Sequence, residues 1–465
     1  MLPLVRNDDT IAAVATAAGP AAIAVIRISG RCAIGISAKC FRGRVPLGEA
    51  HTQTALHGTI VDEAGCVIDE VMATIFRGPR SYTGEDVVEI SCHGGPLIVE
   101  RILGMVCEAG ARLAMPGEFT RRAFLNGKMD LSQAEAVMEM VSVQSEASAR
   151  VAVAQLEGKL GHAVGELRRS LVDLCALLEL ELDFAEESLE LVGSEETRRR
   201  LQEATSEICR LGNTYTEGKK IREGLSVVLT GKPNAGKSSL FNALLRESRA
   251  IVTPIPGTTR DTLEEAVELK GFLFRLSDTA GIRRTVDPIE REGVERTLRA
   301  KAGADVVLVV EDPADPIEER EYQEFLQGLS GSQTAVRVLN KCDLLDDERR
   351  ARALGAGPST IETIPISAKT GWGLDELERA LCRLVADGES IAREPVLLIN
   401  RRHFEAFNKA AAILDQACSN WEKYQSNEMA AIDIREAAGY LGEITGEITS
   451  EDILNSIFSR FCIGK

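Results

Sequence analysis

A glycine-rich stretch near the middle of the chain has the residue types that hold a nucleoside triphosphate. The segment GKPNAGKSSLFNALL places Gly231, Gly236, Lys237 and Ser238 in the pattern GxxxxGK[ST]. Glycines allow backbone N–H groups to close around phosphate oxygens, Lys237 would reach the β- and γ-phosphates, and the Ser238 hydroxyl would ligate magnesium. A strand-like SVVLT precedes the pattern and a helix-like run follows it, which indicates a phosphate-binding loop.

Two later motifs complete a predicted site for magnesium and the γ-phosphate. The strand-like LFRLSD ends in Asp278, whose carboxylate would hold magnesium through a water, and the amide of Gly281 would sense the γ-phosphate. Thr259, in GTTRD, is the candidate for the second hydroxyl ligand of magnesium. These motifs follow the phosphate loop in the order expected of a GTPase.

The choice of base is predicted from NKCD, residues 340–343, which follows an apolar strand. A carboxylate at Asp343 accepts two hydrogen bonds from guanine, whereas adenine does not offer this pair of donors. The later SAK stretch would supply a backbone amide near the base oxygen. The predicted GTP contacts are Asn234, Ala235, Gly236, Lys237, Ser238, Ser239, Thr253, Pro254, Ile255, Pro256, Gly257, Thr258, Thr259, Asp278, Thr279, Ala280, Gly281, Asn340, Lys341, Asp343, Ser367, Ala368 and Lys369.

The groups that usually assist hydrolysis are missing from their usual places. Ile282 follows DTAG where many GTPases have a glutamine that orients water, and an apolar side chain cannot do this. Glu290 is the nearest candidate to replace it, with Asp287 and Glu292 as alternatives. No arginine is an evident source of positive charge for the transition state, since the arginines nearby are typical of a solvated surface.

The pattern along the chain predicts a multidomain protein of α/β and α class. Residues 1–125 combine β-like runs with helical stretches and indicate a small α+β domain, whereas 126–220 and 387–465 are helical in texture. Between them, residues 221–386 alternate apolar strands with amphipathic helices, which is typical of a mostly parallel sheet. We therefore expect a GTPase domain inserted into a discontinuous helical domain.

Composition restricts the environment and the partners. The 465 residues contain no apolar run near the ~20 residues that cross a bilayer, and MLPLVRNDDT has the features of neither a secretion signal nor a transit peptide, so we expect a cytoplasmic protein without membrane association. Eleven cysteines without metal-like spacing are expected to be reduced thiols. A net charge of −17 repels polyanions, so any nucleic acid must meet a local basic patch.

Several stretches outside the GTPase motifs are distinctive. They are RISG, SYTGEDVVEISCHGG, PGEFTRRAFLNGKMDLSQAEA and the C-terminal FCIGK. Together with the GTPase motifs, they resemble the MnmE (TrmE) family of tRNA-modification GTPases over the whole chain. This resemblance implies an N-terminal folate-binding domain that forms a homodimer, a discontinuous helical domain and a Ras-like G domain.

The resemblance also implies a reaction and its partners. Such proteins act with the flavoprotein MnmG (GidA) to attach an aminomethyl or carboxymethylaminomethyl group to C5 of the wobble uridine in certain tRNAs. The one-carbon donor would be a reduced folate, 5,10-methylene- or 5-formyl-tetrahydrofolate. GTP, Mg²⁺ and K⁺ are the other expected cofactors, and hydrolysis would require the two G domains of the homodimer to meet.

Individual residues match the family's functional positions. Asn234 matches its potassium ligand, and Thr253, Ile255 and Thr258 lie in the segment that wraps the ion. A potassium ion beside the phosphates would supply the charge that an arginine brings elsewhere. Glu290 matches the catalytic glutamate, which would orient the attacking water through a second water.

The folate positions and the cysteine are also carried over from the family. Arg27, Glu89, Lys128 and Lys465 match its folate-binding residues. Glu89 could accept the paired N–H donors of a pterin, and the cations could meet the carboxylates of the glutamyl tail. Cys462 matches the family's functional cysteine, and its alternative role is that of a small buried apolar residue.

Two other functions remain open from the sequence. The first is a GTPase switch in RNA or ribosome assembly, in which the flanking domains only hold a partner, and the second is a folate enzyme that GTP merely regulates. Basic clusters that could meet tRNA are more typical of solvated helix faces. They comprise Arg198, Arg199, Arg200, Lys219, Lys220, Arg222, Arg401 and Arg402.

Overall fold

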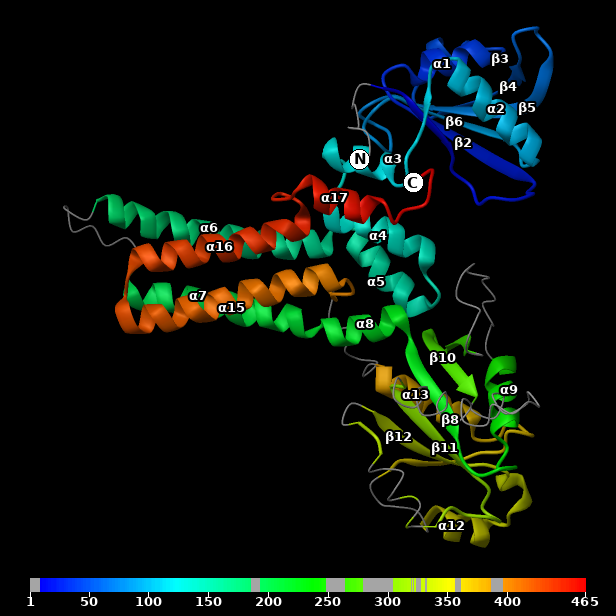
Figure 1. Ribbon diagram of the computed structural model, residues 1–465, viewed down its shortest axis with the longest axis vertical. Coiled ribbons are helices and arrows are strands. Elements are labelled where there is room, and N and C mark those ends of the chain that lie inside the picture. The colour runs from blue at the N-terminus through cyan, green and yellow to red at the C-terminus, as the bar shows by residue number, and fades with distance from the viewer. Residues whose placement is uncertain are drawn as a thin grey trace, which may run out of the picture. The chain divides into compact units, whose positions relative to one another are not determined.

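The structure is a computed structural model of the chain. It describes residues 9–184, 193–247, 264–278, 304–318, 320, 322, 328–330, 333–355, 361–385 and 396–465. The chain forms two compact units, each built from separate segments (Figure 1). Unit 1 comprises Met1–Glu139, Gln155–Val192 and Ser426–Lys465, and unit 2 comprises Met140–Ala154 and Gly193–Gln425.

Unit 1 begins with a seven-stranded sheet of order β3-β4-β5-β6-β2-β1-β7, in which only β1 and β7 pair in parallel. Side chains alternate across a strand, so Ile26 and Ile28 point into a core with Ile90, while Arg27 and Glu89 lie on the other face. Its elements are β1 Ile11–Val14, β2 Ile23–Ser29, α1 Ala33–Cys40, β3 Phe41–Gly43, β4 Thr54–Val61, β5 Val67–Phe76, β6 Val87–His93, α2 Pro96–Glu108 and β7 Arg112–Leu113.

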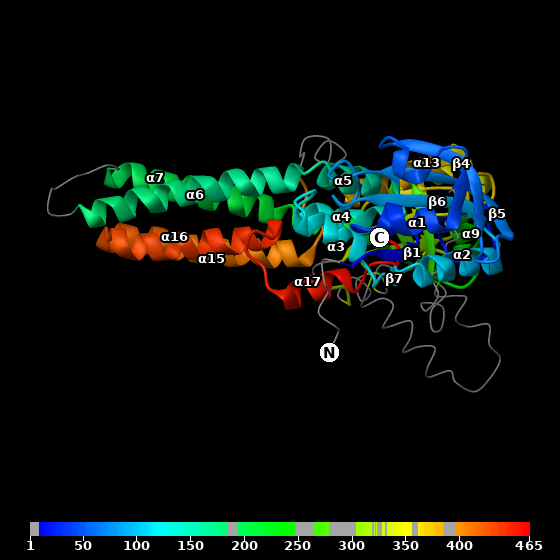
Figure 2. The same ribbon diagram turned by 90° about the horizontal axis from the view of Figure 1, so that it is seen from above.

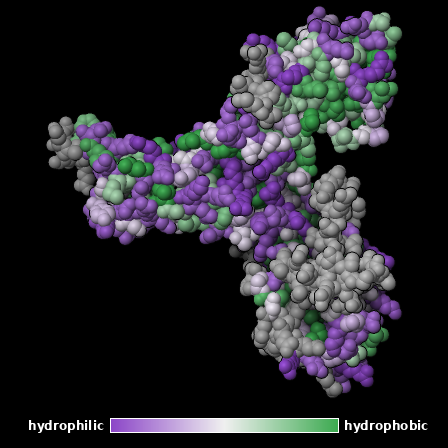
Figure 3. Space-filling view, in the orientation of Figure 1, coloured by the Kyte–Doolittle hydropathy of each residue, from purple (hydrophilic) through white to green (hydrophobic). Residues whose placement is uncertain are grey.

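Helices α1 and α2 cover the apolar face of this sheet. Ile36 of α1 and Ile102 and Val106 of α2 are buried against the strands in one core. Apolar side chains also gather on the surface of this domain (Figure 3). Ile23 on β2 and Met72 on β5 are among its exposed apolar residues. The predicted α+β character of the N-terminal domain is thus confirmed.

The helices of unit 1 come from both helical blocks of the sequence. The long helix α6 packs along α16, and the two lie side by side in both views (Figures 1 and 2). Leu131 and Ala134 of α4 share a small core with Leu454, Phe458 and Phe461 of the C-terminal region. The helices are α3 Glu118–Leu125, α4 Leu131–Ser142, α6 Lys159–Asp183, α16 Asn427–Thr445 and α17 Glu451–Phe458.

Unit 2 contains a six-stranded sheet of order β13-β12-β11-β8-β10-β9. All neighbours pair in parallel except β9 and β10, and β9 is an edge strand that the sequence pattern did not predict. Every residue of β11 is buried, as expected of a central parallel strand covered on both faces. The strands are β8 Leu225–Thr230, β9 Glu264–Leu269, β10 Phe272–Asp278, β11 Val306–Glu311, β12 Thr334–Leu339 and β13 Thr363–Pro365.

The helices of unit 2 likewise join distant segments. Helix α7 packs along α15, so both units pair a helix of the first block with a helix of the second. The predicted discontinuous helical domain is therefore confirmed, while the boundaries at 125, 220 and 386 stay predictions. The helices are α5 Glu146–Leu156, α7 Ser194–Asn213, α8 Tyr215–Glu223, α9 Lys237–Glu247, α12 Asp347–Gly355, α13 Leu374–Val385 and α15 Arg401–Tyr424.

Helix α5 packs on the GTPase sheet, although the sequence pattern grouped it with the helical blocks. Ala147 and Val151 are buried in the same core as Val267 of β9. The Ala147 amide donates to the Gly271 carbonyl at 2.9 Å, in the turn between β9 and β10. Among the described helices, none is long and apolar enough to cross a membrane.

Candidate functional site

The phosphate loop of unit 2 connects β8 to α9. Gly231 and Gly236 have φ values of +140° and +95°, and Asn234 between them has +63°, so the backbone turns through conformations that suit glycine. A Cβ on Gly231 would lie 2.0 Å from the Val310 carbonyl oxygen, which leaves no room for a side chain. The Lys237 ammonium donates to the carbonyls of Gly231 and Lys232 at 2.9 and 2.8 Å, directly over the loop.

Asn340 connects the base-reading motif to the phosphate loop. Its side-chain amide donates to the Ala235 carbonyl at 2.9 Å, and its Oδ1 accepts from the Ala368 amide at 3.0 Å. Asn340 is 2% exposed, so these bonds form away from competing water. One side chain therefore fixes three predicted GTP-binding segments relative to one another.

Asp343 lies next to the SAK stretch, as a guanine site requires. Its Oδ1 accepts from the Ser367 hydroxyl at 2.7 Å, and the neighbouring Cys342 amide donates to the Ile366 carbonyl at 3.0 Å. Lys341 takes a left-handed conformation and bonds to Asp312 at 2.7 Å. Burial opposes ionisation of Asp312, but hydrogen bonds from Lys341 and the Ala314 amide outweigh it and lower the pKa of this carboxyl.

Several predicted GTP and metal residues lie outside the described parts of the chain. Asp278 ends β10 opposite Leu229 of β8, with its backbone at the carboxyl end of the sheet, beside the phosphate loop. No cluster of metal-ligating side chains occurs among the described residues. The residues outside the description are Thr253, Pro254, Ile255, Pro256, Gly257, Thr258, Thr259, Thr279, Ala280, Gly281 and Glu290.

A second cluster forms in unit 1, on the sheet face that α1 and α2 leave uncovered. Arg27 of β2 is opposite Glu89 of β6, and its Nε and Nη2 both lie 2.8 Å from Glu89 Oε1. The Arg27 Nη1 donates to the Gly464 carbonyl at 3.3 Å. The structure thus brings two predicted folate residues together with the C-terminal FCIGK segment.

Two aromatic rings support Arg27. The guanidinium carbon lies 5.0 Å from the centre of the Tyr82 ring and 5.7 Å from that of Phe119. Both distances allow a cation–π interaction. Burial raises the pKa of Tyr82, whose hydroxyl is 2.8 Å from the Thr120 hydroxyl. Sequence reasoning missed these two rings, although both lie in stretches that carried the family resemblance.

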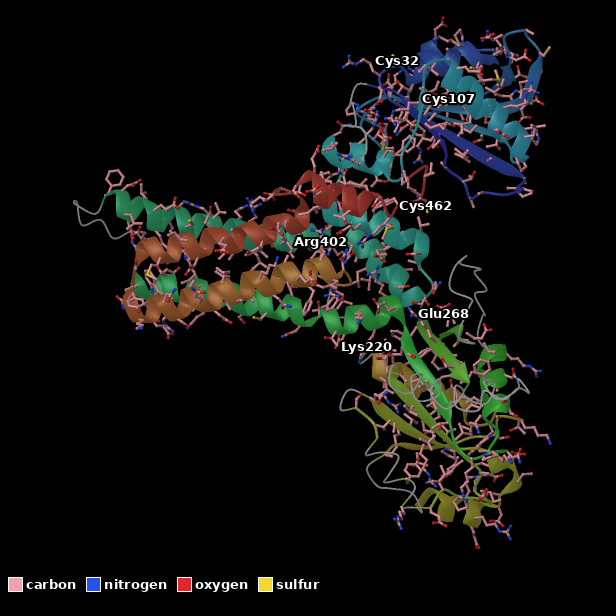
Figure 4. The ribbon with its side chains drawn as sticks, in the orientation of Figure 1. Cys32, Cys107, Lys220, Glu268, Arg402 and Cys462 are labelled. Atoms are coloured by element: carbon pink, nitrogen blue, oxygen red, sulfur yellow. The ribbon has the colours of Figure 1, made fainter. Side chains whose placement is uncertain are left out.

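The other folate candidates lie in neighbouring segments of unit 1. Lys128 is exposed and its ammonium donates to the Pro79 carbonyl at 3.0 Å, in the loop that also supplies Tyr82. Lys465 follows Gly464, and its amide donates to the Cys462 carbonyl at 3.3 Å. Cys462 is an exposed free thiol, which excludes the alternative of a buried apolar role (Figure 4). All eleven cysteines are free, as predicted.

A buried ionic network lies behind this cluster. Arg122 and Glu118, both 2% exposed, are 3.1 Å apart, and Arg122 also contacts Asp9 at 2.6 Å and Glu85 at 3.2 Å. Burial opposes ionisation of Glu118, but hydrogen bonds from Arg112 and the Met115 amide outweigh it and lower its pKa. The Ser29 hydroxyl donates to Glu85 at 2.7 Å, so the network holds the loop of Tyr82 against β2.

The predicted basic clusters are largely occupied by their own helices. Arg198, Arg199 and Arg200 each pair with a glutamate one turn away on α7. Lys220, labelled in Figure 4, donates to the Leu384 carbonyl of α13 at 3.3 Å, and Arg401 pairs with a glutamate of α15. The preference for solvated helix faces over a nucleic-acid patch therefore agrees with these contacts.

The fold and the first of these sites define a P-loop GTPase with a guanine-reading motif. The family described as "MnmE helical domain" matches residues 131–462, and the one described as "GTP-binding protein TrmE N-terminus" matches residues 10–128. The curated tRNA modification GTPase MnmE of Symbiobacterium thermophilum is 47% identical over 99% of this chain and 100% of that protein. That of Chlorobium chlorochromatii is 44% identical over 99% of this chain and 98% of that protein.

The chain belongs to the MnmE family, and it is a GTP hydrolase. Among solved structures, the G domain of the T. maritima FeoB iron transporter is 27% identical, with a TM-score of 0.25, over 35% of this chain and 99% of that chain. The family resemblance predicted from the motifs is confirmed.

Proposed function

We propose that this GTPase modifies tRNA, at C5 of the wobble uridine, as a homodimer in complex with the flavoprotein MnmG. A reduced folate, 5,10-methylene- or 5-formyl-tetrahydrofolate, would donate the one-carbon unit at the Arg27 cluster of unit 1. GTP hydrolysis in unit 2, with Mg²⁺ and K⁺, would drive the cycle. The names of the curated relatives support tRNA modification as the overall activity.

The observation that carries the folate assignment is the contact of Arg27 with both Glu89 and Gly464. A carboxylate held by a guanidinium that two aromatic rings flank can accept the paired N–H donors of a pterin. The Arg27 guanidinium would orient Glu89 for this task. Lys128 and Lys465 are the cations that could meet the glutamyl carboxylates.

Potassium dependence is supported by the phosphate loop and by the sequence, in which no arginine is an evident source of positive charge for the transition state. Asn234 lies within the loop at φ +63°, where its side chain would be a potassium ligand. The Lys237 ammonium provides one positive charge for the phosphates, and a monovalent cation would provide the second. Ser238, the second residue of α9, is the expected magnesium ligand, and Glu290 would orient the attacking water.

Recognition of tRNA is expected to depend on the MnmG partner. The arginines of α7 are paired with glutamates of the same helix, and the chain carries a net charge of −17. Both features oppose a direct polyanion interface on this helix. We therefore expect tRNA affinity to rise strongly when MnmG is added, in a salt-dependent binding titration.

Calorimetric titration of the full-length protein with 5-formyl-tetrahydrofolate tests the folate site. We expect Glu89→Gln to weaken binding at least about tenfold, because a hydrogen bond to a charged group contributes roughly 1.5–3 kcal/mol. Glu70→Gln is the matched control, since Glu70 is an exposed carboxylate on β5 of the same sheet. Absence of binding by the wild type, or equal loss in both variants, would overturn the assignment.

The rate of GTP hydrolysis in potassium compared with sodium tests the predicted ion site. We expect the rate to fall by at least about 100-fold in sodium, in the range found when one preorganised electrostatic partner is removed from a transition state. Asn234→Ala should lose most of the response to potassium while still binding GDP. An equal rate in the two salts would contradict the proposed role of the ion.

A further inference from the structure

The C-terminal pentapeptide FCIGK, residues 461–465, contacts a glycine near its N-terminal end. Gly117 has φ +67°, and its amide donates to the Cys462 carbonyl at 3.4 Å. A Cβ on Gly117 would lie 2.7 Å from the Phe458 carbonyl oxygen and 3.0 Å from the Phe461 Cβ. No residue larger than glycine fits there, because the last residue of α17 and the side chain of Phe461 occupy the space.

A second glycine fixes the other end of the pentapeptide. Gly464 has φ +98°, and a Cβ there would lie 2.3 Å from the Val14 carbonyl oxygen, at the end of β1. Its own carbonyl accepts from Arg27 Nη1 at 3.3 Å. Figures 1 and 2 both place the C-terminus of the chain beside α3 in unit 1, where Gly117 immediately precedes that helix.

We propose that Gly464 is a positioning residue that fixes Cys462 beside the Arg27–Glu89 pair. Cys462 is two residues from Gly464, so its Cα lies within about 7 Å of the Gly464 Cα. Its carbonyl is bound by Gly117, and its thiol is exposed. The backbone on both sides is therefore held while the thiol stays accessible, which suits a group that must meet a ligand at a defined point.

Arg27 has two partners in this arrangement and joins them. One edge of its guanidinium holds Glu89 and the remaining Nη1 holds the pentapeptide through Gly464. A planar guanidinium can do both because its five donors are fixed in one plane, whereas the compact ammonium of lysine cannot. The position of Cys462 is thus tied to the carboxylate that the proposed function assigns to the pterin.

Hydrogen exchange of the C-terminal peptide in Gly464→Ala tests this inference without any ligand. We expect residues 459–465 to exchange about fivefold faster or more, since the alanine disrupts close backbone contacts and a hydrogen bond worth roughly 1 kcal/mol. Gly65→Ala is the matched control, because Gly65 has φ +80° in the same unit but has open space around its Cβ position. Unchanged exchange in Gly464→Ala, or the same change in both variants, would overturn the inference.

The identity of the ligand rests on the proposed function. Folate affinity and the kinetics of modification distinguish a failure of that function from a failure of this inference. In Gly464→Ala the Arg27–Glu89 pair remains, so we expect the fall in kcat of modification to be larger than the change in folate affinity or in KM. Arg27→Lys should loosen the same peptide and also weaken folate binding. If the wild type binds no folate, the proposed function fails. Faster exchange in Gly464→Ala and in Arg27→Lys would then still support the role of Gly464 in holding the pentapeptide. If folate binds and kcat is unaffected by Gly464→Ala, the positioning role is wrong.

Discussion

The phosphate loop of unit 2 and the Arg27 cluster of unit 1 are assembled in opposite ways. The loop is one contiguous segment, and its lysine bonds to carbonyls five and six residues away. Arg27 instead meets partners 62 and 437 positions away in the chain. A contiguous segment carries its geometry in local backbone conformation, whereas the Arg27 cluster exists only when the sheet, α3 and the C-terminus have all packed.

The charges at the two sites also differ. The Lys237 ammonium donates to two backbone carbonyls of its own loop, and its charge would attract the phosphates of a nucleotide. Arg27 is paired with a carboxylate, and behind it Arg122 is buried among three more. The Arg27 site therefore keeps its shape by ion pairs between distant segments, whereas the contacts of Lys237 described above stay within its own loop. Four experiments test this contrast.

Replacing Lys237 should produce the largest effect and confine it to unit 2. Lys237→Ala removes a positive charge from the predicted phosphate site, and we expect GTP hydrolysis to fall by about 100-fold to 1,000-fold. Folate affinity should be unchanged. Lys219→Ala, on an exposed face of α8, is the control and should retain full turnover. A fall in folate affinity together with the loss of GTP hydrolysis in Lys237→Ala would show that the two sites are not independent.

Arg122→Leu should destabilise unit 1 most strongly. The substitution removes the buried cation that pairs with Asp9, Glu85 and Glu118, which costs about 3–5 kcal/mol of unfolding free energy even though Arg112 still pairs with Glu118. Arg101→Leu is the control, because Arg101 is about half exposed and 3.8 Å from Asp62. Denaturant unfolding of the two variants measures the difference, and equal midpoints would show that the network is not a source of stability.

Acidification should weaken the same network. The pKa values of Glu118 and Asp9 are lowered in the folded state, because hydrogen bonds from arginines outweigh their burial. Their stabilisation is therefore complete above the unfolded values near 4 and is lost as pH falls through the lower folded values. When the denaturant midpoint of unfolding is measured from pH 6 to pH 2, we expect it to decrease once the pH is below about 4. The slope should be shallower in Glu118→Gln, and an identical slope would contradict this assignment.

The exposed pairs of α7 should give the smallest effect. Arg199→Ala removes contacts with Glu196 and Glu203 on a solvated helix face, where ion pairs contribute little. We expect no measurable change in the thermal midpoint and no change in GTP hydrolysis. A clear loss of tRNA binding in this variant, with MnmG present, would instead assign α7 a direct role in tRNA recognition.

Much of the architecture could be predicted from the sequence, with instructive exceptions. Periodicity indicated the parallel strands and the two helical blocks, because apolar spacing reflects which face is buried. It missed the edge strand β9 and placed α5 with the helical blocks, although Ala147 and Val151 complete the GTPase core. Amphipathic spacing shows that a helix buries one face, but it does not name the surface that covers it.

The sequence by itself determined the chemistry of the nucleotide site, since the phosphate loop and NKCD are short segments whose residue types carry their own function. It also identified Arg27, Glu89 and Cys462 by family resemblance. Only the tertiary structure decided that Arg27 joins Glu89 to Gly464, that Tyr82 and Phe119 support it, and that Asn340 links three GTP-binding segments. Such contacts connect residues far apart in the chain, and no local pattern specifies them because they depend on how whole elements pack.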